Sequence, residues 1–224
     1  MLNEAVYGMP ELYREKIKKT SLVANPGCYP TSAILPLAPL LAAGLVSCER
    51  IIVDSKSGVT GAGRQPKASS HFCEVNEGLH PYGVGTHRHA PEIAQELSLA
   101  AGAEVELFFT PHLVPMSRGI LSTIYTRLSP GASAGDIHQA LHKKYDQEPF
   151  VQVLPEGMMP HTRWVYGSNQ VHIGVSVDEK RRMVILGCAL DNLTRGASGM
   201  AIQNMNLLLG LDETEGLQFP GVHP

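Results

Sequence analysis

The sequence has few cysteines, no excess of positive charge and no long uninterrupted apolar segment. Its 224 residues include 18 lysines and arginines against 21 aspartates and glutamates, a formal net charge of −3. No basic cluster exceeds short runs such as Lys180-Arg181-Arg182, so nucleic acid is not expected as a partner. Cys28, Cys48, Cys73 and Cys188 form no C-x-x-C pair. This spacing indicates neither a zinc ribbon nor a disulfide framework, and it favours a reducing compartment with one special thiol.

The apolar content is high but gives no membrane or export signal. The longest apolar stretch, residues 33–46, is interrupted by Pro36 and Pro39 and is too short to span a bilayer. The N-terminal sequence MLNEAVYGMPELYREK is not that of a signal peptide. With 43% hydrophobic residues, the chain can bury the core of one large domain or of one and a half. We therefore expect a globular, cytosolic protein with no membrane partner.

Local patterns predict helices interspersed with strands. Helices are expected over 10–19, 91–102, 134–145 and 194–210. A further helix, kinked or short, is expected after the turn 25–27, with Pro36 and Pro39 near its beginning and its end near 44. Strands are expected to end at 24 and to cover 50–57, 104–115, 119–128, 150–155, 170–178 and 183–192. The strands 104–115 and 119–128 are linked around 116–119, and several strands are expected to pair as sequential hairpins. The predicted fold class is α+β: a mixed, largely antiparallel sheet with helices on one face.

The stretch VANPGCYPTSA places Cys28 between a turn and the start of a helix. Pro30 suits the first turn, where its missing N–H costs nothing, and Thr31 and Ser32 can cap locally. At a helix N-terminus the dipole and the free N–H groups favour a thiolate, which is the nucleophilic form. The alternative is a small apolar residue packed under a turn. The local pattern leaves both interpretations open.

The glycine-rich stretch GVTGAG, residues 58–63, follows a predicted strand. Its glycine spacing does not match the dinucleotide-binding fingerprint, and Arg64-Gln65-Pro66 do not open a helix. A loop that approaches a ligand or a neighbouring segment closely and a plain turn are equally compatible with it.

The stretch THRHAPEI places His87 and His89 on one side of an extended segment, with Arg88 on the other. As metal ligands they would need a third protein ligand, and the spacing to His80 matches no standard site. As polar residues at the start of a helix they would need no function. As a general acid or base, one of them would have to meet Cys28 in space, which their separation in sequence does not prevent.

Two further groups of polar residues have both functional and structural interpretations. His138 and His142 lie four residues apart on a predicted helix, where a partly solvated surface is favoured over a metal site. Arg118 lies in the turn between two strong strands, where a guanidinium can bind a carboxylate or phosphate with two hydrogen bonds. A plain surface turn residue is the alternative for Arg118.

Five motifs in order resemble one enzyme family. NPGCYPTSA, SGVTGAGRQP, VNEGLHPYGVGTHRHAPEI, PHLVPMSRGI and DNLTRGASGMAIQNMN together are similar to N-acetyl-gamma-glutamyl-phosphate reductase, the NADPH-dependent enzyme of arginine biosynthesis. The resemblance covers nearly the whole chain and implies a C-terminal domain like that of glyceraldehyde-3-phosphate dehydrogenase.

The resemblance also implies a division of the chain. Enzymes of this family begin with a dinucleotide-binding domain, and no such motif precedes Cys28. We expect residues 1–24 to be a remnant of that domain, and 25–190 to form the catalytic, substrate-binding and oligomerisation domain. Residues 191–224 are expected to contain a helix that packs on the nucleotide-binding domain.

The same resemblance assigns site residues and a substrate. It implies that Cys28 attacks an acyl phosphate and forms a thioester, which NADPH reduces to a semialdehyde. It implies that His87 manages protons, with His89 as the alternate. Arg118 and Arg88 are the candidates for the substrate anions. Further candidates are Arg64, Ser57 and Gly58 near the reacting end of the substrate, and Asn192 for NADP. The resemblance implies no metal.

Three alternatives to this function remain at the level of sequence. The related reductase of lysine biosynthesis acts on a carrier-linked acyl phosphate, and aspartate semialdehyde dehydrogenase shares the mechanism but differs from the NPGCYPT motif. A non-catalytic oligomerisation piece is the alternative of a different class. Long exposed strands also make a homo-oligomer an expectation.

Overall fold

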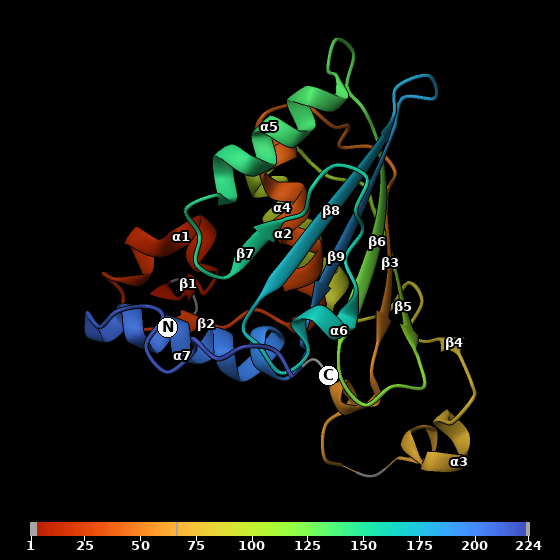
Figure 1. Ribbon diagram of the computed structural model, residues 1–224, viewed down its shortest axis with the longest axis vertical. Helices are drawn as coiled ribbons and strands as arrows, with labels where there is room; N and C mark the ends of the chain where they lie inside the picture. Colours follow the sequence, from red (N-terminus) through yellow and green to blue (C-terminus); the bar gives the residue numbers. More distant parts are fainter. Residues whose placement is uncertain (1–3, 66, 223–224) are drawn as a thin grey trace.

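The structure is a computed structural model that describes residues 4–65 and 67–222. Pro66 of the glycine-rich motif, residues 1–3 of the segment 1–24 and the last two residues lie outside the described part. The described chain folds around one twisted sheet with helices gathered on one side (Figure 1). The strands of this sheet are β3 (Ile51–Ser57), β4 (His80–Pro81), β5 (Leu107–Leu113), β6 (Ile120–Arg127), β7 (Val151–Val153), β8 (Val171–Asp178) and β9 (Met183–Leu190).

The described sheet is mixed and mostly antiparallel, in the order β4-β5-β3-β6-β9-β8-β7. Parallel pairs are β3 with β5 and β7 with β8, and the other neighbours run antiparallel. This confirms the predicted α+β class. The expectation of several sequential hairpins is wrong, because β3 lies between β5 and β6 and hydrogen-bonds to both. Among the long described strands, β8 and β9 alone follow each other in sequence and pair directly.

The two faces of the sheet differ in what covers them. Along β3, Ile51, Val53 and Ser55 are buried, whereas Ile52 points the other way and is exposed. Because strand side chains alternate, this pattern assigns one face to the core and the other to the surface. The helices that cover the core face are α2 (Cys28–Ala42), α4 (His89–Ala101) and α5 (Ala134–Tyr145).

The helix α2 is longer than predicted, and its prolines lie in its second half rather than near its beginning. A proline inside a helix leaves the carbonyl four residues earlier without its N–H partner. For Pro39 that carbonyl belongs to Leu35, and the buried hydroxyl of Tyr145 on α5 donates a hydrogen bond to it. The helix therefore continues through Pro39 because a side chain of another helix replaces the missing bond.

The chain ends pack together beside the sheet (Figure 1). The short strands β1 (Val6–Tyr7) and β2 (Val23–Ala24) pair in parallel, with α1 (Pro10–Ile17) between them in sequence. The helix α1 contacts α7 (Gly199–Leu209), which a π-helical turn over Thr194–Ser198 precedes. Short helices complete the described chain: η2 (Val59–Ala62), η3 (Ala68–Ser70), α3 (Phe72–Val75) and α6 (Thr162–Val165).

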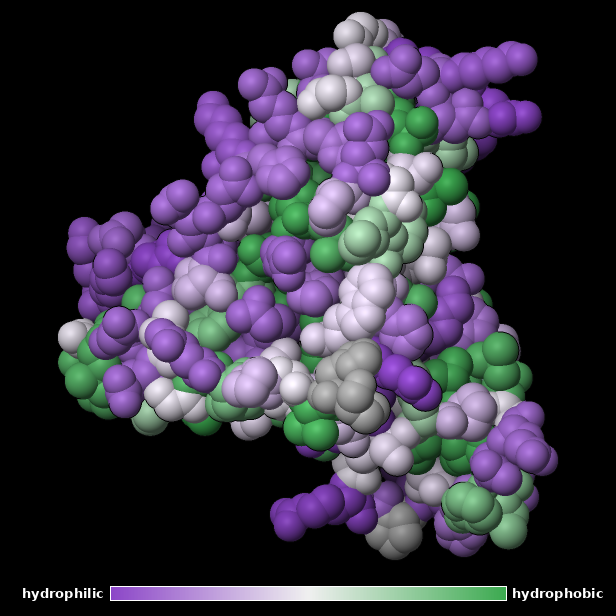
Figure 2. Space-filling view, in the orientation of Figure 1, coloured by the Kyte–Doolittle hydropathy of each residue, from purple (hydrophilic) through white to green (hydrophobic). Residues whose placement is uncertain are grey.

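The helix α7 buries polar side chains together with the apolar Met200 and Leu207. Its buried side carries Gln203, Asn204 and Asn206, whereas Ile202 and Met205 are exposed. Figure 2 shows hydrophobic residues at the lower left, over the end of α7, and at the lower right around β4 and α3. Across the part of the chain that the structure describes, no helix is both long enough and apolar enough to cross a bilayer.

Candidate active site

The predicted position of Cys28 at a helix N-terminus is confirmed. Cys28 is the first residue of α2, and Gly27 precedes it with extended backbone (φ −71°, ψ 161°). The expectation that Thr31 and Ser32 cap this end is wrong, because their hydroxyls donate to carbonyls instead. The Thr31 hydroxyl bonds to the Gly27 carbonyl at 2.9 Å and the Ser32 hydroxyl to the Tyr29 carbonyl at 2.8 Å. The first N–H groups of the helix therefore receive no side-chain cap.

Three buried serines connect this first turn of α2 to the sheet. The hydroxyl of Ser122 on β6 lies 2.6 Å from those of Ser32 and Ser55. Because Ser32 gives its proton to the Tyr29 carbonyl, Ser122 must donate to Ser32, and Ser55 to Ser122. This chain of hydrogen bonds fixes the nucleophile's helix turn against β3 and β6.

The thiol of Cys28 is partly buried, and burial decides its protonation. Desolvation raises the pKa of the Cys28 thiol above its ordinary value, although hydrogen bonds from the Tyr29 and Cys28 amides and the charge of Arg88 oppose this shift. The expectation that the helix N-terminus makes a thiolate in the resting protein is therefore wrong in its net direction. A neighbouring base has to remove the proton.

Two histidines lie against the first turn of α2. The rings of His87 and His89 are 5.6 and 6.0 Å from the Tyr29 ring and 4.9 Å from each other. A β-carbon at position 27 would lie only 2.5 Å from Nε2 of His89. Glycine at 27 therefore lets the His89 ring contact the residue before Cys28, and the structure brings together the two parts of the predicted cysteine and histidine site.

Hydrogen bonding distinguishes the two imidazoles. The His89 amide donates to Nδ1 of His87 at 3.1 Å, so neutral His87 carries its proton on Nε2 and can donate it. Burial, followed by the charge of Arg88, lowers the pKa of His87. Burial, followed by the charges of His87 and Arg88, lowers the pKa of His89 to about 4. Both rings are neutral at pH 7, and a neutral imidazole is the form that can accept a proton from a thiol.

A glutamate on α4 holds the turn before Cys28. Oε1 of Glu92 accepts hydrogen bonds from the Gly27 amide at 3.0 Å and from the Tyr7 hydroxyl at 2.8 Å. Burial, with the neighbouring Glu92 carboxylate, raises the pKa of Tyr7, so its hydroxyl remains a donor. The sequence analysis did not single out Glu92 or Tyr7, because neither lies near Cys28 in sequence.

A cavity of about 480 Å³ contains several of the predicted substrate residues. Ser57, Gly58, His87 and Arg88 line it together. The sequence analysis missed other lining residues, which a local pattern does not connect with Cys28: Gly61, Lys67, Ser69, Ser70, Tyr82 and Leu113. The Tyr82 hydroxyl lies 2.9 Å from that of Tyr29, which connects this wall to α2.

Two of the predicted arginines lie elsewhere. Arg64 is exposed and lines a separate cavity of about 490 Å³ together with Phe72. Arg118 lies under Tyr166 and donates through Nη2 to Asp191 at 2.8 Å and to Thr194 at 2.9 Å. Arg118 is therefore already paired with a buried carboxylate and is not a free surface residue.

The Gly58 backbone and the Asn192 carboxamide, which were expected to bind ligands, form hydrogen bonds to other groups of the chain. The Gly58 amide donates to the Gly119 carbonyl at 2.9 Å, so it is not free for a substrate. A β-carbon at 58 would lie 2.8 Å from the Ser117 and Arg118 backbone, so this glycine serves close approach of two loops. Asn192 accepts from the Gly119 amide at 2.7 Å and donates to Thr60 at 3.0 Å. Asn192 therefore joins the same two loops.

The described residues offer no group for a metal ion. Within residues 4–65 and 67–222, no three histidine, cysteine, aspartate or glutamate side chains are placed to hold one. His142 is exposed and lies 2.8 Å from Asp146, as a surface helix residue does.

The sequence and the fold of the chain resemble those of known proteins. Residues 28–192 match the family model described as semialdehyde dehydrogenase, dimerisation domain. The chain belongs to this family. The match begins at Cys28 and ends at Asn192, so it includes the helix turn, both histidines and the loops described above.

Curated relatives carry a more specific name. N-acetyl-gamma-glutamyl-phosphate reductase of Moorella thermoacetica is 56% identical over 220 residues, which are 98% of this chain and 64% of the relative. The enzyme of the same name from Rhodospirillum rubrum is 58% identical over 99% of this chain and 63% of its own length. The chain thus spans a little under two thirds of the length of these relatives.

Solved structures show the same fold at low identity. Aspartate semialdehyde dehydrogenase II of Vibrio cholerae superposes with a TM-score of 0.75 at 19% identity, over 93% of this chain and 69% of that one. A probable aspartate semialdehyde dehydrogenase of Pseudomonas aeruginosa gives a TM-score of 0.71 at 18% identity, over 92% of this chain and 68% of that one. This likeness confirms the semialdehyde dehydrogenase type of fold.

Proposed function

We propose that this chain carries the acyl-transfer site of an N-acetyl-gamma-glutamyl-phosphate reductase, an oxidoreductase of arginine biosynthesis. The observation that carries the proposal is Cys28 at the first position of α2 with His87 and His89 against the same turn. The name shared by relatives at 56–58% identity supports this substrate. The proposed location is the cytoplasm.

The resting site is a neutral thiol beside neutral imidazoles. In the proposed reaction His89 takes the Cys28 proton, and the thiolate attacks the carbonyl carbon of the acyl phosphate. The carbon–sulfur bond forms, the bond between the acyl carbon and phosphate oxygen breaks, and phosphate leaves. His87, which holds a proton on Nε2, donates to oxygen where negative charge develops. The uncapped amides of the first α2 turn are proposed to bind the oxyanion.

Charged residues around the cavity are proposed to bind the substrate anions. Arg88 lines it beside Ser57 and has an exposed side chain. Lys67, which lines the same cavity, is a further candidate. Arg118 is proposed to reach a substrate carboxylate with the part of its guanidinium that Asp191 and Thr194 leave free.

Reduction of the resulting thioester is proposed to use NADP in its reduced form, which supplies a hydride. The described contacts of Asn192 do not fit direct recognition of that cofactor. Its carboxamide already bonds to Gly119 and Thr60, and its side chain is buried. We assign Asn192 to holding the loop of residues 57–63, and we propose that the cofactor is bound by another part of the whole enzyme.

The exposed apolar side chains of helix α7 support the domain arrangement expected from sequence. Residues 25–190 are proposed as the catalytic and oligomerisation domain. The described parts of the segments 1–24 and 191–224 contact each other through α1 and α7. The exposed side of α7, with Ile202, Met205 and Leu209, is proposed to pack on a nucleotide-binding domain.

A second copy of the chain is proposed as the partner of the open sheet face. Ile52 on β3 is directly opposite Phe108 on β5 and Tyr125 on β6, and all three are exposed. A continuous apolar row of this kind is typical of an interface. Phe108→Arg should reduce the mass measured by light scattering to that of a monomer. Gln95→Arg, on the exposed side of α4, should leave this mass unchanged. A monomer in both the parent and the variant would refute this assignment.

Trapping of the acyl intermediate tests the central proposal. The chain is mixed with N-acetyl-glutamyl phosphate without NADPH, quenched, digested and analysed by mass spectrometry. An N-acetylglutamyl adduct on Cys28 that is absent from Cys28→Ser supports the proposal. No adduct, under conditions in which a full-length reductase gives one, would show that these residues do not form the acyl-transfer site on their own.

A further inference from the structure

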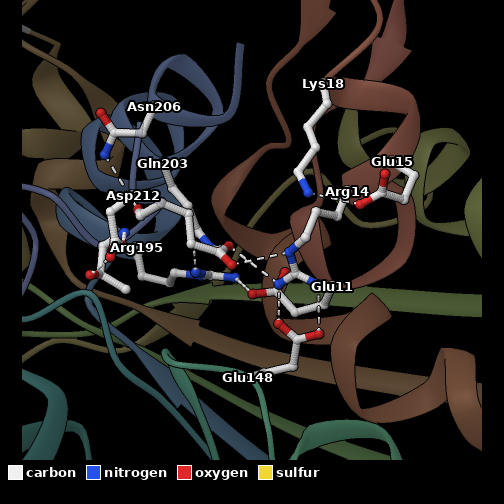
Figure 3. Close-up of polar contacts among 11 residues, drawn as sticks. Glu11, Arg14, Glu15, Lys18, Glu148, Arg195, Gln203, Asn206 and Asp212 are labelled. Atoms are coloured by element: carbon white, nitrogen blue, oxygen red, sulfur yellow. Dashed lines mark hydrogen bonds and ion pairs between the residues drawn. The ribbon is translucent and has the colours of Figure 1, made fainter. Parts of the chain in front are cut away.

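A partly buried network of ionic and polar side chains connects the two ends of the described chain (Figure 3). Arg195 in the π-helical turn is fully buried, and it donates to Oε1 of Glu11 at 2.5 Å and to Gln203 at 2.7 Å. Gln203 donates to Glu213 at 2.9 Å, and Glu213 accepts from Arg14 at 3.1 Å. The network thus joins α1, the π-helical turn, α7 and the segment that follows α7.

The π-helical turn forms the wall beside Cys28. A β-carbon at Gly196 would lie 2.7 Å from the Cys28 β-carbon and 3.2 Å from its α-carbon. The Gly196 amide is held by the Asp191 carbonyl at 2.9 Å. Glycine at 196 therefore lets the turn contact the cysteine directly, and a shift of the turn would change the space available to the Cys28 side chain.

The two side chains that precede Gly196 connect this turn to different parts of the chain. Thr194 accepts from Arg118 at 2.9 Å on the side of the sheet, and Arg195 reaches Glu11 on α1. A five-residue π-helical turn is rare and is found mostly at functional sites. The neighbouring Asn25, three residues before Cys28, is itself bonded to Asn204 of α7 at 2.9 Å.

A contribution to folding stability does not by itself account for the buried ion pair of Arg195 and Glu11. Taking two charges out of water is costly, and replacing a buried ion pair with apolar residues of similar size is often neutral or stabilising. The side chains of Arg195 and Glu11 are both fully buried, and Nε of Arg195 and Oε2 of Glu11 have no partner among the described residues. The pair is therefore better explained by the geometry that it imposes than by its contribution to folding.

We propose that Arg195 is a positioning residue for Cys28: its pairing with Glu11 holds the π-helical turn of residues 194–198 against the cysteine and keeps the thiol buried. The inference rests on the proposed role of Cys28 as nucleophile. The ion pair holds Gly196 in place, and Gly196 limits the exposure of the thiol. Loosening the turn exposes the sulfur to water and misaligns it for acyl transfer.

The test measures thiol chemistry, which does not depend on reductase activity. Iodoacetamide alkylation of Cys28 is followed from pH 6 to 10 by peptide mass spectrometry in the parent chain and in the double variant Glu11→Leu/Arg195→Met. Removing both charges avoids a lone buried ion. Buried Cys188 on β9 serves as an internal control, because it reacts only if the chain opens. Arg14→Met/Glu148→Leu removes an ion pair at the far end of the network, which Gln203 and Glu213 separate from Arg195.

The expected result is a shift of the Cys28 alkylation midpoint to lower pH by about one unit, or about tenfold faster reaction at pH 7. Cys188 should stay protected, and the control pair should leave the Cys28 profile unchanged. An unchanged Cys28 profile in the folded Glu11→Leu/Arg195→Met chain would overturn the proposal.

A second variant covers the case in which the double variant does not fold. Arg195→Lys keeps the buried charge but loses the forked contact to Glu11 and Gln203. It should shift the Cys28 midpoint in the same direction with Cys188 protected, and an unchanged profile would again overturn the proposal. A shifted profile without any acyl adduct in the parent chain would leave Arg195 as the positioning residue of a thiol whose substrate is not the proposed acyl phosphate.

Discussion

The contact between Gly27 and His89 provides a quantitative test of the site geometry. In Gly27→Ala the new β-carbon would lie 2.5, 2.8 and 3.0 Å from Nε2, Cε1 and Cδ2 of the His89 ring. Favourable separations of such atoms are about 3.5–4.0 Å, so the ring would have to retreat by about 1 Å. Its neighbours Tyr29 and His87 leave little room for that movement. Overpacking of this kind costs about 1–3 kcal/mol of unfolding free energy.

The backbone itself should not oppose this substitution. Gly27 has φ −71° and ψ 161°, which alanine adopts freely. Alanine is worse than glycine at the residue before a helix by about 0.5–1 kcal/mol, but it also restricts the unfolded chain by about 0.4–1 kcal/mol, so these effects nearly cancel. In a His89→Ala background Gly27→Ala should therefore cost close to nothing. The coupling between the two substitutions should be about 1–3 kcal/mol.

Urea unfolding of the four chains in this cycle measures the coupling. Trp164, the only tryptophan in the sequence, provides a fluorescence signal, and circular dichroism at 222 nm provides an independent one. Equal losses from Gly27→Ala in both backgrounds would show that the ring does not lie where the structure places it. No loss in either background would refute the overpacking argument itself.

Three further predictions concern the serine chain, pH and Arg118. Ser122→Ala should lower the unfolding free energy by about 1–3 kcal/mol, because the buried Ser55 hydroxyl loses its partner, while Thr123→Ala on the opposite face should cost less in the same urea titration. The pKa of His89 is about 4 in the folded chain and about 6.5 in the unfolded chain, so the unfolded chain binds more protons between these pH values. The free energy of unfolding should therefore fall as the pH falls from 6.5 to 4. The melting temperature of His89→Gln should decline less steeply over this range. If Arg118 binds substrate, Arg118→Lys should raise the acyl phosphate concentration for half-maximal Cys28 labelling at least about tenfold, and unchanged labelling would restrict Arg118 to its pairing with Asp191.

Local sequence patterns predicted the elements that depend on local interactions. The helix α5 begins and ends where its periodicity indicated, because Ser133 and Asp136 form a capping box at its start. The helix α4 ends at Gly102, whose backbone is left-handed (φ 65°). The hairpin of β8 and β9 was predicted because the turn around Glu179 lies between two apolar strands. In each case the deciding contacts lie within a few residues.

Features that depend on distant partners were not predicted. The position of β3 between β5 and β6 depends on hydrogen bonds to both strands, which alternation of apolar residues does not encode. The length of α2 depends on the Tyr145 hydroxyl more than a hundred positions away. The two prolines alone therefore suggested a kinked or short helix.

Sequence motifs identified the residues of the candidate site, but they did not predict the pKa shifts and ion pairs of those residues. Cys28 and the two histidines were identified from motifs, and the structure places the histidines against the helix turn that Cys28 begins. The upward shift of the Cys28 pKa was not predicted, because it depends on how deeply the folded chain buries the thiol. The pairing of Arg118 with Asp191 likewise depends on two segments that meet only after folding.

The separation of Glu11 and Arg195 has a consequence for biosynthesis. Glu11 precedes Arg195 by 184 residues, so α1 leaves the ribosome long before its ionic partner has been translated. During that interval the π-helical turn does not yet exist, and Cys28 on a nascent chain lacks the wall that later shields its sulfur. The thiol is then more open to oxidants and to electrophilic metabolites than in the finished protein. Translation of the π-helical turn that contains Arg195 is thus also the step at which this cysteine becomes protected.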